Sequence, residues 1–96
     1  MTDLYIAVMT AAADVCSVPV EKVLTRVHKH EVTTARYIGW YVLNTKHGWS
    51  HSRIQRSAPM FHRVTIRHGV NRIAETPYNS EIGDLVSRTI DSVGFV

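Results

Sequence analysis

The chain of 96 residues contains few cysteines, prolines and glycines, with one, three and five of them respectively. Its single cysteine, Cys16, cannot form an internal disulfide and belongs to no CxxC pair, which disfavours a secreted domain and a structural zinc finger. The longest uncharged stretch, from Leu4 to Ala13, is far shorter than the roughly 20 residues that a membrane span needs. We therefore expect a cytoplasmic protein without a membrane partner.

The chain also has only a small excess of positive charge, since 11 Lys and Arg residues against 8 Asp and Glu residues leave a net charge of +3. This excess alone does not identify a partner. Most of the basic residues are arginines, the type preferred for phosphate and base contacts. A chain of this length holds one modest core, so we expect a single domain over residues 1–96. No catalytic or phosphate-loop motif stands out, so we expect neither an enzyme nor a cofactor.

Apolar residues recur at helical spacing along the chain, and no segment alternates as a strand would. This pattern predicts an all-α fold, a compact bundle of about six helices. The expected helices cover residues 2–16, 17–24, 31–46, 50–56, 60–75 and 80–93. Pro19 is expected in the first turn of the second helix, and Gly48 is expected to end the third. The expected capping residues are Thr2 or Asp3, Ser17, Ser50, and Asn79 or Ser80.

The fourth and fifth expected helices are joined by a segment, Ser57-Ala58-Pro59, that predicts a tight turn. A short helix, a turn and a longer helix form the layout of a helix-turn-helix, which we place at about residues 50–75. The longer helix has two different faces. Its apolar stripe consists of Ile66, Val70, Ile73 and Ala74. The other face is free to enter a groove of DNA.

The side chains of this second face have the chemistry of base recognition. Arg63 and Arg67 can donate pairs of hydrogen bonds to guanine edges or phosphates. Asn71 can read adenine, and Thr65 can contact a thymine methyl group. On spacing alone, a solvated helix face with scattered arginines fits the pattern equally well.

Residues 25–30 lack apolar periodicity and predict a loop rich in positive charge. Its basic residues are Arg26, His28, Lys29 and His30. Loops of this kind reach into a minor groove or line a phosphate backbone, although a solvated connection is the commoner role of a single charged run. Two basic patches in so short a chain favour double-stranded DNA as the partner.

Residues 17–73 contain a set of motifs in an order that is characteristic of one family. The motifs are Val20-Glu21-x-Val23-Leu24, the basic loop, Ala35-Arg36-x-Ile38-x-x-Tyr41-x-Leu43, Ile54, and Val64-Thr65-Ile66-x-His68-Gly69. Without any gap, they resemble the C-terminal DNA-binding domain of the bacterial replication initiator DnaA. The resemblance implies a Trp-repressor-like helical fold that contains a helix-turn-helix and binds double-stranded DNA.

The resemblance also implies roles for residues at matching positions. His28 takes the place of a loop arginine that enters the minor groove, and Arg36 and His68 fall where the family contacts phosphates. The residues that fall where the family reads bases are His62, Arg63, Val64 and Thr65. The family's Gly-Gly-Arg-Asp-His-Ser/Thr-Thr run is replaced by Pro-Met-Phe-His-Arg-Val-Thr at residues 59–65. An acidic acceptor suited to cytosine is thereby exchanged for donors suited to guanine or phosphate.

We therefore expect a sequence-specific DNA-binding protein that acts as a transcriptional regulator or a replication-control factor. A compact regulator of a phage or mobile element in a bacterial cell would suit the size. The alternative, from another class, is a protein–protein interaction adaptor on the same helical scaffold. The last helix either closes the core or forms the surface of a homodimer or another protein contact. Its apolar stripe consists of Ile82, Leu85, Val86, Ile90 and Val93.

Histidines and aromatic residues suggest two further functions. The pairs His28-x-His30 and His47-x-x-x-His51 have ligand-like spacing, but no carboxylate or cysteine completes a set, so we expect no metal site. The aromatic residues of the third helix could stack on single-stranded bases. We instead expect Trp40 to pack against the first and last helices.

Overall fold

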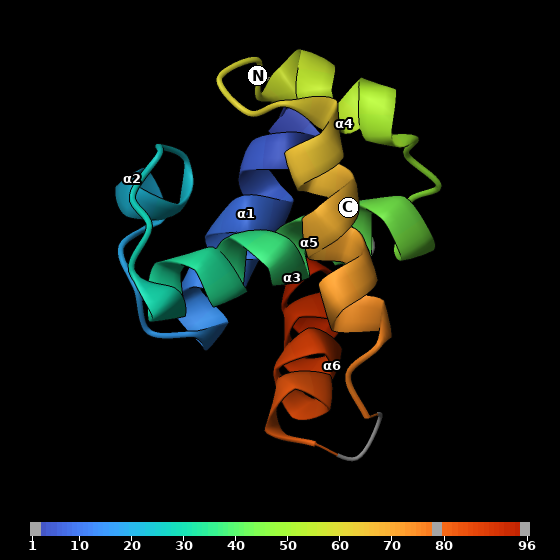
Figure 1. The fold of residues 1–96 in the computed structure, drawn as a ribbon. Helices are drawn as coiled ribbons and strands as arrows, with labels where there is room; N and C mark the ends of the chain where they lie inside the picture. The colour runs from blue at the N-terminus through green and yellow to red at the C-terminus, as the bar shows by residue number, and fades with distance from the viewer. Residues whose placement is uncertain (1–2, 78–79, 95–96) are drawn as a thin grey trace.

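The computed structural model of the protein describes residues 3–77 and 80–94, which form six helices and contain no strand. The all-α fold expected from the sequence is thereby confirmed (Figure 1). The helices are α1 (Asp3–Val15), α2 (Val20–Val23), α3 (His30–Lys46), α4 (His51–Ser57), α5 (Arg63–Ala74) and α6 (Glu81–Val93).

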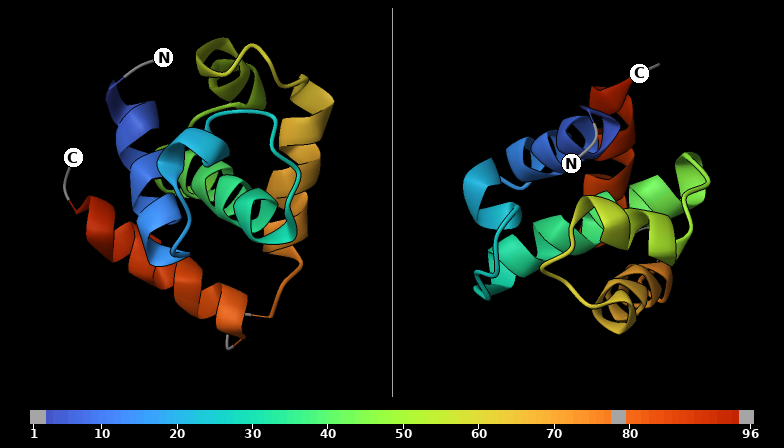
Figure 2. Two further views of the ribbon diagram at one scale, coloured as in Figure 1. Left: turned by 90° about the vertical axis from the view of Figure 1, so that its left-hand side faces the viewer. Right: turned by 90° about the horizontal axis from the view of Figure 1, so that it is seen from above.

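Helix α3 lies at the centre of the molecule, with α1 on one side and α5 on the other (Figure 2, right). Its expected apolar stripe is buried, since Val32, Ala35, Ile38, Val42 and Leu43 are all at most 2% exposed. The remaining helices pack around this axis, because α3 also contacts α2, α4 and α6. A single core therefore joins the helices that bear the candidate site.

Trp40 of α3 is completely buried and is the largest side chain of the core. Its indole Nε1–H donates to the hydroxyl of Tyr5 in α1 at 3.2 Å. The expected packing of Trp40 against the first helix is therefore confirmed. A role in base stacking does not fit a ring that solvent cannot reach.

Two glycines allow the helices to approach closely. A Cβ on Gly39 would overlap the Met9 sulfur of α1, and a Cβ on Gly69 of α5 would lie 2.5 Å from the Tyr37 ring of α3. Real Cβ atoms do not come this close to another heavy atom. The crossing of α3 and α5 therefore depends on the missing side chain at Gly69.

Serine hydroxyls cap two helices as expected. The Ser50 hydroxyl accepts a hydrogen bond from the Arg53 N–H at 3.1 Å, and the Ser80 hydroxyl accepts one from the Gly83 N–H at 3.2 Å. Gly48 adopts a φ of +68° just after α3, which is the conformation that ends a helix most readily at glycine. The alternative caps Thr2 and Asn79 lie outside the described residues.

The expected beginnings of two helices are wrong. Ser17 does not cap α2, because it has a left-handed φ of 58° and lies two residues before the N-cap residue, Pro19. Pro19 therefore precedes the helix and is not in its first turn. Helix α5 begins at Arg63 and not at Met60, because Met60 and Phe61 belong to the turn that precedes it.

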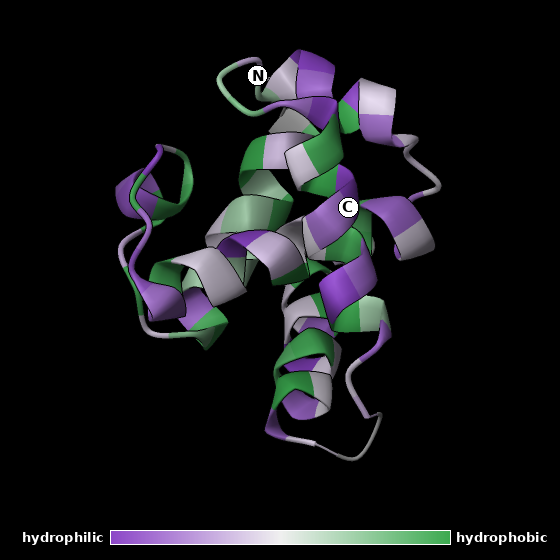
Figure 3. Ribbon diagram, in the orientation of Figure 1, coloured by the Kyte–Doolittle hydropathy of each residue, from purple (hydrophilic) through white to green (hydrophobic). Residues whose placement is uncertain are grey.

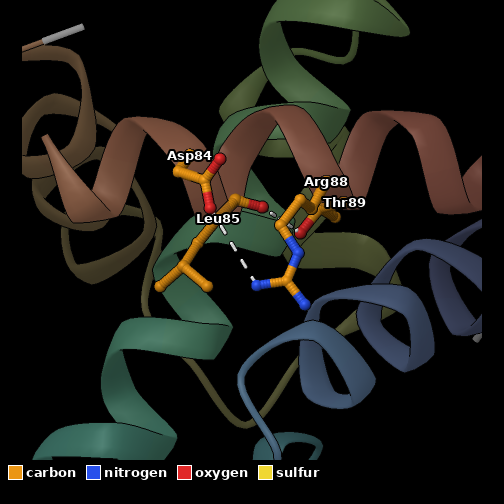
Figure 4. Close-up of polar contacts among 4 residues, drawn as sticks. All are labelled: Asp84, Leu85, Arg88 and Thr89. Carbon is orange, nitrogen blue, oxygen red and sulfur yellow. Dashed lines mark hydrogen bonds and ion pairs between the residues drawn. The ribbon is translucent and has the colours of Figure 1, made fainter. Parts of the chain in front are cut away.

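Helix α6 closes the core by packing on α1 and α3. Its apolar stripe lies against the core, with Val93 buried and Ile82, Leu85, Val86 and Ile90 partly buried. Inside the helix, the buried Thr89 hydroxyl donates to the Leu85 carbonyl at 2.8 Å, and on its outer side Arg88 lies 4.0 Å from Asp84 (Figure 4). None of the helices in the described residues has the length and apolar character required to cross a bilayer.

Candidate nucleic-acid interface

The turn between α4 and α5 covers residues 58–62 and is attached to the core. Ala58 and Phe61 are buried, and the Phe61 N–H donates to the Ala58 carbonyl at 3.0 Å. The Phe61 ring meets the Trp40 ring edge-on, with 5.2 Å between the ring centroids. The turn is longer than the expected Ser57-Ala58-Pro59 segment, and Phe61 fixes the position from which α5 starts.

His62 is the N-cap residue of α5. Its Nδ1 accepts a hydrogen bond from the Val64 N–H at 3.1 Å, which satisfies one of the unpaired N–H groups of the first turn. A neutral imidazole that accepts through Nδ1 carries its proton on Nε2. The exposed His62 therefore uses Nδ1 to cap the helix, which leaves Nε2 as its other hydrogen-bonding atom.

Helix α5 is divided into a buried and an exposed face, as the sequence predicts. Ile66, Gly69, Val70 and Ile73 are buried, so the ribbon alternates between hydrophobic and hydrophilic residues along the helix (Figure 3). Ala74, which was expected in the apolar stripe, is exposed at the last position of the helix. The exposed residues that were expected to contact DNA are Arg63, Thr65, Arg67, His68 and Asn71. All of the expected contact residues of this helix are therefore accessible.

Two further residues complete this exposed face. Val64 is 52% exposed, an unusual environment for a large apolar side chain, and it lies beside Arg63 and Thr65 at the start of the helix. Arg72 is exposed one turn after His68. Its position four residues after His68 could have identified it from the sequence, because residues four apart share a helix face. Arg63 itself is held by α4, since its Nη1 donates to the Ser52 hydroxyl at 3.3 Å.

The basic loop between α2 and α3 is joined to the turn before α5. Both Nε and Nη2 of Arg26 donate to the Met60 carbonyl, at 2.9 and 2.6 Å. The left view of Figure 2 shows this loop running from α2 towards α5. The bidentate contact brings together two segments that are 34 residues apart in the sequence.

The other basic residues of this segment are exposed but differ in their positions. His28 lies in the loop, Lys29 is the N-cap residue of α3, and His30 is the first residue of that helix and not part of the loop. His30 and His68 line the same surface pocket of about 460 Å³, together with Tyr37 and Arg72. The Tyr37 ring also meets the His68 ring edge-on at 6.0 Å. The two predicted basic patches therefore meet at this part of the surface, through His30 of the first patch and His68 of the second.

Arg36 does not belong to this surface, which corrects the expected phosphate contact. Its side chain is only 2% exposed, and its guanidinium donates to main-chain carbonyls of the loop. Its carbonyl partners are Lys22, Val23, Thr25 and Val27. Burial lowers the pKa of Arg36, and the nearby Tyr5 and Tyr37 hydroxyls oppose this shift. Because its donors are used inside the protein, Arg36 has a structural role.

Metal ligands do not gather at the interface. No three His, Cys, Asp or Glu side chains among residues 3–77 and 80–94 are placed to hold a metal ion together. Cys16 is a free thiol at the end of α1, and partial burial raises its pKa while Arg88 lowers it. The chemical groups that the interface offers are guanidinium, ammonium, imidazole, amide and hydroxyl groups.

The chain was compared with protein families, curated proteins and solved structures. No family, curated protein or solved structure matches it.

Proposed function

We propose that the protein binds double-stranded DNA, with α4 and α5 acting as a helix-turn-helix of the kind found in the DnaA DNA-binding domain. One observation supports this proposal above all others. Helix α5 exposes arginines from its first turn to its last without a single acidic side chain, and a second basic segment is held next to its start by Arg26. A helix of this width fits the major groove of B-form DNA, where such donors meet base edges and phosphates.

In this proposal the first two turns of α5 make the base contacts. Arg63 and Arg67 donate to guanine edges or to phosphates, and the exposed Val64 and Thr65 contact thymine methyl groups. Asn71 follows one turn later, where it can pair with adenine. The end of the helix, through His68 and Arg72, lies beside the pocket at the start of α3 and contacts the phosphate backbone.

The loop gives the second part of the interface. His28 and Lys29 are exposed and extend towards the backbone or the neighbouring minor groove. Arg26 adds its charge at the turn, because its guanidinium is already bound to Met60. Positive charge along α5 and beside its start would neutralise phosphates that border the groove.

We further propose that this binding serves transcriptional regulation or the control of replication in a bacterial or phage-infected cell. The chain contains no GxxxxGK[ST] segment, the motif of a P-loop that binds ATP. In a replication setting, the domain would therefore act on DNA as an accessory factor or as a competitor for binding sites.

The first experiment is a fluorescence-anisotropy titration with a random-sequence duplex at several salt concentrations. The logarithm of the binding constant should fall linearly with the logarithm of the salt concentration, with a slope of roughly −0.9 per neutralised phosphate. A protein that binds no duplex even at low salt would disprove the proposal and favour the interaction adaptor.

The second experiment tests the base contacts with Arg63→Ala. This change should relax the base preference at one position of the site, at a cost of about 1–3 kcal/mol. Selection of bound sequences from a random duplex library measures the preference of the wild type and the variant. The matched control is Arg88→Ala, because Arg88 is also exposed to solvent but lies on α6 next to the end of α1. An unchanged preference in Arg63→Ala, or an equal loss in the control, would contradict the assignment.

A further inference from the structure

We propose that Arg36 is the positioning residue of this interface: it holds the basic loop against the turn before α5, and so keeps the two basic segments in one orientation. This inference rests on the proposed DNA-binding function. Residues 27–29 of the loop adopt no regular secondary structure, and the loop side chains that would contact DNA are exposed. The conformation of the loop must therefore be set by residues other than the exposed His28 and Lys29.

The Arg36 guanidinium provides that constraint. Its Nε donates to the Val23 carbonyl at 2.9 Å, and its Nη2 lies within hydrogen-bonding distance of three further carbonyls. These belong to Lys22 at 3.1 Å, Val27 at 3.0 Å, and Thr25. The chain from the end of α2 to the middle of the loop thus curves around one buried cation.

The same guanidinium also touches the turn. Its central carbon lies 4.7 Å from the centroid of the Phe61 ring, a distance typical of a cation–π contact. Arg26 makes the reciprocal connection, because it extends from the loop to the carbonyl of Met60, the neighbour of Phe61. The loop and the turn are therefore connected twice, once through each arginine.

Arginine is the residue type that these contacts require. A guanidinium carries five donors in a rigid plane and stacks on aromatic rings, whereas a lysine ammonium is a single point with three donors. The partners of Arg36 among the described residues are carbonyls and a ring, and none is a carboxylate. The carbonyl dipoles of the loop stabilise the buried charge, so the charge and the loop conformation depend on each other.

Limited trypsin digestion of Arg36→Met tests this role without DNA. Trypsin cuts after Arg26 and Lys29 when the loop opens, and the cutting rate follows the population of the open form. We expect cleavage at these two bonds, identified by fragment mass, to become roughly tenfold faster or more, while circular dichroism shows that the helices persist. An unchanged cleavage rate would overturn the proposal.

The matched control is Arg53→Met, which removes another arginine that stacks on an aromatic ring. Arg53 lies over Trp49, with its central carbon 4.2 Å from the ring centroid, and it is remote from the loop in the sequence. Equal acceleration of loop cleavage in this control would also overturn the proposal. If Arg36→Met does not fold, Arg36→Lys keeps the charge and the side-chain stem but loses the planar donors, and it should still open the loop.

A thermodynamic cycle separates positioning from a merely structural role. Arg36→Met should weaken DNA binding several-fold in the wild-type background, but far less in a chain that also carries His28→Ala and Lys29→Ala, because the two exposed loop side chains that extend to DNA are then absent. Equal losses in both backgrounds would show that Arg36 only stabilises the fold. A wild-type chain that binds no DNA would disprove the proposed function, whereas unchanged loop cleavage would disprove the role of Arg36 even if DNA binds.

Discussion

At the scale of single residues, the junction between α1 and α3 depends on the hydrogen bond between Trp40 and Tyr5. The indole N–H of Trp40 is enclosed by the core and donates to the Tyr5 hydroxyl at 3.2 Å. Burial raises the pKa of Tyr5, while the bond to Trp40 and the charge of Arg36 oppose this shift. The hydroxyl thus remains protonated and accepts the hydrogen bond through a lone pair.

Tyr5→Phe should lower the free energy of unfolding by about 1–3 kcal/mol, because the buried Trp40 donor loses an acceptor while the ring that packs on it remains. Urea denaturation followed by tryptophan fluorescence measures the change. Tyr41→Phe is the matched control, since Tyr41 is only partly buried in the same helix as Trp40. An equal loss in the control would contradict the importance of this hydrogen bond.

The positions of Arg36 and His62 differ from the expected ones because their hydrogen-bond partners cannot be inferred from residue type. Arg36 follows Ala35 at the edge of the apolar stripe, and its acceptors are main-chain carbonyls, which every residue possesses. His62 caps α5 through an imidazole, although the usual capping residues are Ser, Thr, Asp and Asn. The sequence therefore predicted an α5 that starts too early and an Arg36 that faces DNA.

At the scale of elements, the candidate interface depends on how α5 crosses α3. The crossing is close because Gly69 faces the Tyr37 ring, and the same ring meets His68 on the exposed side. A change at Gly69 therefore acts on the packing of α5 and on the surface that α5 presents.

Gly69→Ala should lower the free energy of unfolding by about 1–3 kcal/mol, because the new methyl group overlaps the rigid Tyr37 ring. In an isolated helix the same change would add about 1 kcal/mol of stability. A loss of stability in the protein would therefore show that the overlap with the Tyr37 ring outweighs the gain in helix propensity. Gly39→Ala is the comparison, and it should cost less, because the Met9 side chain that it meets is flexible. Thermal unfolding of both variants provides the measurement, and a stabilised Gly69→Ala variant would contradict the observed crossing.

The elements themselves were largely predictable from the sequence. Apolar spacing and candidate capping residues together indicated the six helices that the described residues form, and Ser50, Ser80 and Gly48 marked three of their ends. The bounds that were wrong are those of α2, which is four residues long and too short for a reliable periodicity, and the beginning of α5. The contact between the loop and the turn was not predictable, because it joins Arg26 to a carbonyl 34 residues away.

At the scale of the whole molecule, the small net charge of +3 is unevenly distributed. Arg36 is buried, while the basic residues of the loop segment and of α5 are exposed. His30 and His68 line one surface pocket, where their imidazoles offer hydrogen-bonding groups.

Lys29→Ala should make the salt dependence of DNA binding less steep, with the log–log slope changing by roughly 0.9 for the one phosphate contact that is lost. Lys46→Ala serves as the control, because Lys46 is the last residue of α3 and lies at the opposite end of that helix from His30. Anisotropy titrations at several salt concentrations provide the measurement, and an unchanged slope in Lys29→Ala would place this side chain away from phosphate.

Because Arg36 holds the loop through main-chain carbonyls, the amino-acid sequence of the loop can change more easily than its conformation. The hydrogen bonds from Arg36 to the loop end on the main chain, so they place no demand on the identity of the exposed side chain at Thr25. Together with the exposed His28 and Lys29, this position could accept other residues while the path of the chain stays the same, whereas Val27 packs against the core. Exchanging the exposed residues of the loop therefore offers a route to new target preferences without redesign of the core.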